Sequence, residues 1–355
     1  MSNYKEYNDS IAFHPGYYLK EIVEESGLTQ EDFAKRLGTT PKNLSILIRG
    51  EQDLSIEMAT KLSRMLGTSI AFWLNLQKTY NEKIAEFINA EEQSREKEVI
   101  KLIDYKYFRD MFGLPDLPRK VNEQIKVLRE FLSVGSLLNL KEKDLAVSFR
   151  SYSDNLSESN IVNANAMVQI AINETIDTEA PKYNKAKFEK AVEFALTQTK
   201  NHSSFLPIIK QSFNEAGVVL VALPNLKNSG ISGATKKVDG KVMIMVNDRR
   251  HFADTFWFTL FHEIGHVMNN DYGISCEGDR EDIANLFAQN KLIPQDEYEK
   301  FVYNKKQFNE YDIRVFANSI DRDPGIVFGR LLIDKKIEHN DVFLANKLRK
   351  KYNIV

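Results

Sequence analysis

The chain has 355 residues, of which 43% are hydrophobic and 28% are charged, and its net charge is −2. This length allows two or three globular domains, and the balanced charge excludes general electrostatic attraction to nucleic acid. The single cysteine excludes an intramolecular disulfide, and the first residues lack an apolar signal segment, so we expect a cytoplasmic protein. No apolar run approaches the roughly 20 residues that cross a bilayer, which predicts no membrane partner.

Residues 13–80 predict a series of short amphipathic helices separated by glycines. Thr29 is placed to cap one helix that Gly38 ends, and Pro41 opens the next, which Gly50 ends. Two short helices joined by a tight turn form a helix-turn-helix. The outer face of the second helix is polar without an acidic residue, as expected of a helix that enters the major groove of DNA. A small helical bundle that binds protein is the alternative. The polar residues of that face are Lys42, Asn43, Ser45 and Arg49.

Three stretches between residues 14 and 77 extend this interpretation. They read HPGYYLKE, TQEDFAKRLGTTPKNLSILIRG and LGTSIAFWLNLQ. Together they resemble the HigA-type antitoxins of the XRE helix-turn-helix family. The resemblance implies operator DNA as a partner and a homodimer as the binding form. By position it also implies that Gln30 faces a phosphate, and that the base-facing residues are Thr40, Lys42, Asn43 and Ser45.

Residues 91–186 carry the weakest functional signal. The charged run 91–98 predicts a solvated helix face or a linker, and residues 121–132 and 160–176 predict helices. Residues 148–160 are rich in serine and asparagine, which predicts a loop. We expect a helical segment that bridges two domains, with dimerisation and signal sensing as alternatives.

From residue 187 the pattern changes to α+β. Residues 218–223 are β-branched and apolar, as in a strand, and Asp239-Gly240 separates two further strand-like runs, 231–238 and 242–247. The Asp-Gly pair predicts a tight hairpin turn. We therefore expect a small antiparallel sheet whose outer strand is a candidate for pairing with an extended peptide.

The stretch 254–271 contains the sequence His262-Glu263-Ile264-Gly265-His266. A helix places residues four apart on one face, so both imidazoles could bind one metal ion, with Glu263 beside it. Two neutral imidazoles suit Zn²⁺, which lowers the pKa of a bound water to roughly 7, and a neighbouring carboxylate could accept its proton. The apolar flanks predict a buried helix that Asp254 could cap. The alternative is a core helix with two histidines.

A catalytic zinc site requires a third protein ligand. Asp271 is expected to point along the helix axis, away from the metal, and the cysteine and its neighbour lie in a loop between glycines. Glu281 instead begins an apolar helical run whose packing could fix its carboxylate, and Asn285, four residues later, could orient that carboxylate. Asp282 is the nearest rival, rotated by about 100° on the helix. We therefore predict Glu281 as the third ligand. The possible ligands that follow the motif in the sequence are Asp271, Cys276, Glu277, Asp279, Glu281 and Asp282.

Five blocks between residues 205 and 335 read GVVLVAL, SGISGAT, DTFWFTLFHEIGH, EDIANLFA and PGIVFGRL. Together they resemble the ImmA/IrrE metallopeptidase family. The resemblance implies a gluzincin-like zinc protease that cleaves XRE-type repressors, often after stress, and it places Glu281 at the ligand position. Asn270 stands where many members have a further histidine, and we expect it outside the metal's ligands. Arg330, in the last block, is a candidate oxyanion stabiliser, with a fold-supporting arginine as the alternative.

Together these patterns predict a mainly α chain with an α+β C-terminal domain. Residues 1–90 form the all-helical DNA-binding domain, 91–186 a helical middle segment, and 187–355 the zinc peptidase domain with its small sheet. The predicted function is a transcriptional regulator whose endopeptidase cleaves a repressor or related protein. The alternatives are an antitoxin-like repressor with a catalytically silent binding module and a self-cleaving repressor. Glu263 favours the active form, because an inactive descendant usually loses its general base.

Overall fold

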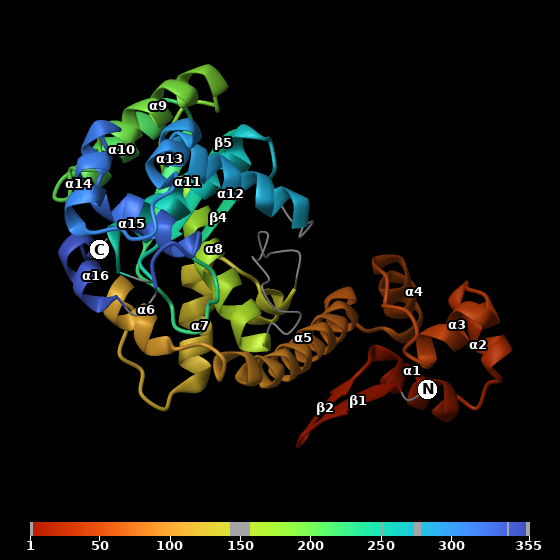
Figure 1. Cartoon of the computed structure of the whole chain (residues 1–355). Helices are drawn as coiled ribbons and strands as arrows, with labels where there is room; N and C mark the ends of the chain where they lie inside the picture. The colour runs from red at the N-terminus through yellow and green to blue at the C-terminus, as the bar shows by residue number, and fades with distance from the viewer. Residues whose placement is uncertain (1–2, 143–156, 250, 273–277, 339–340, 353–355) are drawn as a thin grey trace. The chain divides into compact units, whose positions relative to one another are not determined.

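The computed structural model describes residues 3–142, 157–249, 251–272, 278–338 and 341–352. The chain forms two compact units, residues 1–95 and 96–355, and helix α5 (Ile70–Ile100) continues from the first into the second (Figure 1). Helices dominate both units, as predicted. Of the helices in the described ranges, none combines the length and the apolar composition that a membrane crossing requires.

The first unit begins with a hairpin that precedes its helices. Strands β1 (Tyr4–Tyr7) and β2 (Ser10–Phe13) pair antiparallel around a turn in which Asn8 has a φ of 51°. The sequence did not indicate this hairpin, because strands of four residues are too short to show a periodic pattern, and β1 also mixes tyrosine with charged residues. The predicted helices follow as α1 (Pro15–Glu25), α2 (Gln30–Leu37), α3 (Pro41–Ile48) and α4 (Ile56–Leu66).

The predicted helix boundaries of the first unit are confirmed by hydrogen bonds at the caps. Thr29 Oγ1 accepts from the backbone N–H of Asp32 at 3.1 Å, and Gly38 ends α2 with a φ of 73°. Helices α1 and α3 approach closely at Gly16, where a Cβ would lie 2.1 Å from the carbonyl oxygen of Leu47. Only glycine permits that contact. The apolar faces of α1 to α4, with Trp73 of α5, form one hydrophobic core.

The second unit is built around a three-stranded sheet with helices on both faces. Helices α6 (Tyr105–Phe112), α7 (Val121–Leu132), the 3-10 helix η1 (Leu137–Lys141) and α8 (Glu158–Asp177) precede α9 (Lys185–Thr197) and α10 (Phe205–Asn214). The strands are β3 (Val218–Leu223), β4 (Gly233–Val238) and β5 (Lys241–Asn247). The remaining helices are α11 (Ala253–Met268), α12 (Gly278–Leu292), α13 (Gln295–Val302), α14 (Glu310–Ser319), α15 (Pro324–Ile333) and α16 (Val342–Leu348).

The sheet is mixed, which corrects the prediction of a purely antiparallel one. The strand order is β3-β5-β4; β3 runs parallel to β5, and β4 runs antiparallel to β5. The hairpin itself is confirmed: Asp239 and Gly240 have φ values of 48° and 77°, and a tight hairpin turn of this type needs both to be positive. The order of the strands depends on where the loop after β3 carries the chain, which local sequence patterns do not encode.

Both faces of the sheet are buried, and so are all seven residues of β5. Val242 and Ile244 face a core shared with α9, α10 and α11. Met243 and Met245 face a second core shared with α6, α7 and α8. Helices α6, α7 and α8 therefore pack on the same sheet that leads into α11. The division of the chain at residues 90 and 186 stays a prediction.

Glu96 corrects the interpretation of residues 91–98 as a solvated face. Its side chain is fully buried at the end of α5, where its carboxylate forms an ion pair with Arg129. The same carboxylate accepts from the Ser136 hydroxyl at 3.0 Å and from the Leu137 N–H at 2.6 Å. A charged residue is tolerated in an interior only when such partners are present. These partners lie 33 to 41 residues away in sequence, so the charged run alone does not reveal them.

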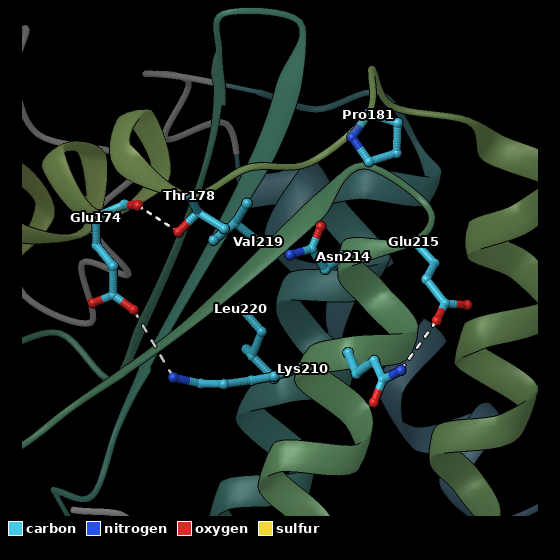
Figure 2. Close-up of a pocket in the computed structure, with 9 residues that line it drawn as sticks. Glu174, Thr178, Pro181, Lys210, Asn214, Glu215, Val219 and Leu220 are labelled. Carbon is cyan, nitrogen blue, oxygen red and sulfur yellow. Dashed lines mark hydrogen bonds and ion pairs between the residues drawn. The ribbon is translucent and has the colours of Figure 1, made fainter.

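The two edges of the sheet lie in different surroundings. The edge at β3 borders a cavity of about 470 Å³ between α8 and α10. Figure 2 shows that Glu174 and Lys210 approach each other in front of this edge, with Oε1 and Nζ 3.9 Å apart. Burial raises the pKa of the Glu174 carboxyl. The other edge, β4, packs against α11, which carries the histidine motif.

Candidate metal centre and helix-turn-helix surface

Helix α11 is buried along almost its whole length, as its apolar flanks predict. Its start differs from the expected one, because the helix begins at Ala253 and Asp254 lies within its first turn. The Asp254 carboxylate forms a bidentate ion pair with Arg349, at 3.0 Å to Nε and 2.8 Å to Nη2. Burial raises the pKa of Asp254 in spite of this pairing. Asp254 therefore fixes the C-terminal segment against α11 and does not act as the N-cap.

The structure brings three predicted ligands together on α11 and α12. The Nε2 atoms of His262 and His266 lie 3.1 Å apart, and the Glu281 carboxylate oxygens lie 3.3 Å and 3.6 Å from them. Two ligand atoms 2.0–2.1 Å from a tetrahedral Zn²⁺ are about 3.3 Å apart. The measured distances are close to this value, and the two histidines meet different oxygens of the Glu281 carboxylate, so the three side chains converge as the ligands of one zinc ion would. Two imidazoles and one carboxylate also match the ligand set of a catalytic zinc site.

Gly265 explains how α12 reaches the histidines. A Cβ at this position would lie 3.1 Å from Ala284 Cα, tighter than nearly all real contacts, so the two helices touch where the side chain is missing. The buried face of α12 includes Ala284 and Ala288, as expected. Ile283 and Leu286 of the same apolar run are instead 51% and 54% exposed. Small residues, rather than the whole run, therefore position Glu281.

The rival ligands are placed less favourably or lie outside the described residues. Asp282 points into solvent. Cys276, Glu277 and the side chain of Asp279 lie outside the part of the chain that the structure describes. Asn270 adopts a φ of 54° just beyond the end of α11.

Each histidine contacts an oxygen through its second ring nitrogen. Asn285 Oδ1 lies 3.0 Å from His262 Nδ1, and Asp271 Oδ2 lies 2.9 Å from His266 Nδ1. Such contacts orient an imidazole and leave Nε2 free for a metal. Asn285 was expected to orient the Glu281 carboxylate, and the contact with a histidine was not foreseen.

The prediction that Asp271 points away along the helix axis is wrong. Asn270 takes the left-handed conformation and reverses the chain, so that the Asp271 N–H donates to the His266 carbonyl at 2.9 Å. This is a Schellman ending, which asparagine permits. The asparagine pair before Asp271 was the signal in the sequence that could have revealed it.

The side chain of Glu263 points toward the edge strand β4. Its Oε2 accepts from the Thr235 hydroxyl at 2.7 Å, and a Cβ on Gly233 would lie 2.6 Å from its Oε1. The carbonyl oxygen of Ser232 accepts a hydrogen bond of 2.9 Å from the N–H of Asn247, its partner on β5. Along an antiparallel ladder, residue pairs that exchange backbone hydrogen bonds alternate with pairs that do not. Gly233, Thr235 and every second residue after them therefore direct their backbone groups away from β5. The buried carboxylate thus lies beside an edge of β4 that pairs with no other strand of the described residues.

Arg330 lies on α15, in a different environment from the ligand cluster. Its Nε donates to Asp334 at 2.8 Å, and its guanidinium lies 4.7 Å from the centre of the Tyr298 ring. It lines a cavity together with Asp254 and Phe258, and among the described residues neither motif histidine nor Glu263 lines that cavity. The oxyanion role of Arg330 stays a prediction.

The predicted DNA-facing residues lie around the start and outer face of α3. Gln30 opens α2, and Gln30, Thr40 and Lys42 are exposed. Thr40 also caps α3, since its hydroxyl oxygen accepts from the N–H of Asn43 at 3.1 Å. Lys42 is therefore the exposed cation of this surface nearest the start of α3.

Two of these residues already have partners within the protein. Asn43 donates to Thr39 Oγ1 at 3.0 Å, and its Oδ1 accepts from Gln52 at 2.7 Å. Arg49 pairs with Glu51 and also donates to the Ser45 hydroxyl at 2.6 Å. The side chain of Glu51 thus adds an acidic group next to a surface that the sequence predicted to be free of them.

Comparison with known proteins matches both regions. A helix-turn-helix family model matches residues 19–73, and the model of the IrrE N-terminal-like domain matches residues 214–319. Virulence-associated protein I of Dichelobacter nodosus is 32% identical over 80 residues, which are 22% of this chain and 74% of the relative. The uncharacterized HTH-type transcriptional regulator YddM of Escherichia coli K12 is 36% identical over 72 residues, 20% of this chain and 77% of the relative. An addiction module antidote protein of the HigA family from Coxiella burnetii aligns in structure with 27% identity, over 24% of this chain and 94% of that one, with a TM-score of 0.22.

Proposed function

Because the chain belongs to the XRE-type helix-turn-helix family and carries an IrrE N-terminal-like domain, we propose that it is a DNA-binding transcriptional regulator with a zinc endopeptidase. Its peptidase cleaves a repressor or a related regulatory protein. The convergence of His262, His266 and Glu281 beside the buried Glu263 is the observation that carries this proposal.

The roles of the residues follow from their contacts. A bound zinc ion supplies Lewis acidity, which makes water more acidic and polarises a carbonyl. Glu263 accepts a proton from the attacking water and passes it to the leaving amine. The Thr235 hydroxyl donates to Glu263 Oε2, which holds the carboxylate in place and leaves Oε1 to accept that proton. Asp271 and Asn285 orient the two imidazoles.

The edge of β4 binds the substrate backbone. An extended peptide that pairs antiparallel with Gly233 and Thr235 passes directly over Glu263, because both residues touch that carboxylate. Residues on both sides of the cleaved bond must be extended and unpaired to lie along β4, so we infer that the cleaved segment is a linker or a loop of the repressor. Through its helix-turn-helix unit, the protein binds operator DNA as a homodimer.

The test is incubation of the zinc-loaded protein with helix-turn-helix repressors from the same genome, followed by mass spectrometry of the products. Glu263→Gln removes the proton acceptor and keeps the ligands, so cleavage should slow by roughly 10²- to 10⁴-fold. Equal cleavage by both proteins would exclude this mechanism.

The same incubation separates two other functions. A catalytically silent binding module would retain a repressor without cutting it. A self-cleaving repressor would lose its own helix-turn-helix unit when no other protein is added. Retention of Glu263, which mere binding does not need, supports the active peptidase over the silent module.

A further inference from the structure

A small cavity lies between α11, α12 and α15, and it is lined on α11 by Phe258, one helical turn before His262. Its volume of about 160 Å³ is similar to that of a cavity that holds one benzene ring. It is therefore large enough for a single side chain of about five heavy atoms. Its apolar walls come from Phe258, Leu292, Ile293, Ile326, Leu332 and Ile333.

The two arginines that line this cavity differ in their partners. Arg349 is held by the bidentate ion pair with Asp254. Arg330 pairs through Nε with Asp334 and through Nη2, at 3.4 Å, with Gln295. Its Nη1 is buried and makes no well-aligned hydrogen bond to the described residues, and the Tyr298 hydroxyl is the polar group beside the guanidinium. A buried donor on a charged group favours a ligand that brings an acceptor.

The position of the cavity relates it to one side of the scissile bond. Phe258 lies one helical turn before His262, with ring centroids 6.5 Å apart. Strand β4 runs from Gly233, at Glu263, to Lys237, whose Nζ lies 4.3 Å from the Tyr272 ring just beyond the end of α11. A peptide antiparallel to β4 runs the opposite way. Residues that follow its scissile bond therefore lie toward the N-terminal half of α11, where the cavity is.

We propose that this cavity receives the side chain immediately C-terminal to the scissile bond, and that Arg330 selects glutamine or glutamate there. The inference rests on the proposed peptidase function and names its substrate preference. Both side chains have an apolar stem for the walls and an oxygen that accepts from Nη1. Arg330 and Arg349 each already pair with one carboxylate, so the charges around the cavity are balanced. The cavity can therefore accept either the neutral amide of glutamine or the carboxylate of glutamate. Lysine and arginine would place a second cation beside Arg330.

The first measurement uses the zinc-loaded full-length protein and a peptide library based on the linker of a cleaved repressor. Every amino acid is represented at the position after the scissile bond, and products are identified by mass spectrometry. Glutamine and glutamate should be enriched over methionine, a near-isostere of glutamine without a strong acceptor. A library that is cut with methionine favoured equally would overturn the inference and leave the peptidase function standing. A library that is not cut at all, with the repressor also intact, would remove both.

The second measurement is binding by the Glu263→Gln variant, which should hold peptides without turning them over. Fluorescence anisotropy should show the glutamine and glutamate peptides binding about 10- to 100-fold more tightly than the methionine peptide. Arg330→Met keeps the length of the stem and should abolish this difference. Asp334→Asn breaks the ion pair but keeps the guanidinium, so the difference should remain. Arg314→Met, on the exposed face of α14, is the matched control.

Thermal melting of each variant tests whether the change disturbs the fold. If Arg330→Met unfolds, the preference for glutamine and glutamate is still tested by the library with the wild type and by peptide binding to Asp334→Asn. A preference for glutamine that persists in a folded Arg330→Met variant would assign the selectivity to another residue and overturn the proposal.

Discussion

Asp271 Oδ2 lies 2.9 Å from Nδ1 of His266, whereas the corresponding contact of His262 is made by the amide oxygen of Asn285 at 3.0 Å. One histidine is thus oriented by a carboxylate and the other by a neutral group. A carboxylate behind an imidazole raises its basicity and makes it a stronger metal ligand. The two motif histidines, equivalent in the sequence pattern, are therefore chemically different in the folded protein.

Asp271→Asn should weaken zinc binding by about 10- to 100-fold, the usual effect of losing a group that orients a ligand. The substitution keeps the shape of the side chain and removes its charge. Competition with a chromophoric chelator measures the affinity. Asp296→Asn, at an exposed position of α13, serves as the control and should change nothing. Wild-type affinity in both Asp271→Asn and Asp271→Ala would show that the contact does not support the metal.

Glu281→Ala should weaken zinc binding substantially more than Asp282→Ala does. The reason is geometric, because the Glu281 oxygens lie 3.3 Å and 3.6 Å from the two Nε2 atoms while Asp282 faces solvent. Both changes sit on neighbouring positions of α12, so they are matched for any effect on helix stability. The same chelator competition applies, and the opposite ranking would overturn the ligand assignment.

Lys42→Ala should weaken binding of the full-length protein to its own promoter and lower the salt dependence of that binding. Replacement of Asn43 by alanine should cost roughly 1 to 3 kcal/mol if it contacts a base. Glu51→Gln should have the opposite effect, because it releases Arg49 from its ion pair and removes a negative charge beside α3. Gel shifts at several salt concentrations measure all three. Promoter binding that is absent or insensitive to salt would identify the unit as a protein-binding bundle.

The helix-turn-helix unit should lose stability as the pH falls below about 6.5, the unperturbed pKa of histidine. Burial lowers the pKa of His14, whose Nδ1 caps α1 by accepting from the Gly16 N–H at 3.0 Å. The unfolded chain therefore binds a proton more readily, and the stability contributed by neutral His14 is complete above that pH and lost below it. His14→Asn keeps an N-cap acceptor without titrating.

Hydrogen exchange of the α1 amides in the full-length protein, corrected for intrinsic rates, measures this effect between pH 7 and pH 5. In the wild type, the protection of the α1 amides against exchange should decrease as the pH is lowered from 7 to 5. In the His14→Asn variant it should change less. Equal loss of protection in both proteins would assign the acid sensitivity to other groups.

The sequence by itself determined the local structure of this protein. Helix periodicity, the threonine caps, the terminating glycines and the Asp-Gly turn predicted most helices of the first unit, the β4–β5 hairpin and the buried α11. These features depend on residues within about one or two turns of each other, and short-range patterns record such interactions directly. The spacing of His262 and His266 is also a short-range pattern, and so is the apolar helical run that begins at Glu281.

Only the tertiary structure decided which distant groups meet. The parallel pairing of β3 with β5, the burial of Glu96 against Arg129, and the contact of Asn285 with His262 all join segments that lie more than 20 residues apart. Asp271 is close in sequence to His266, but its contact depends on the left-handed conformation of Asn270, which reverses the chain after α11. The oxyanion role of Arg330 stays a prediction, because the sequence does not say which cavity a helix faces. The packing of α15 against α11 decides that Arg330 lines the cavity beside Phe258, since burial is a property of the whole fold.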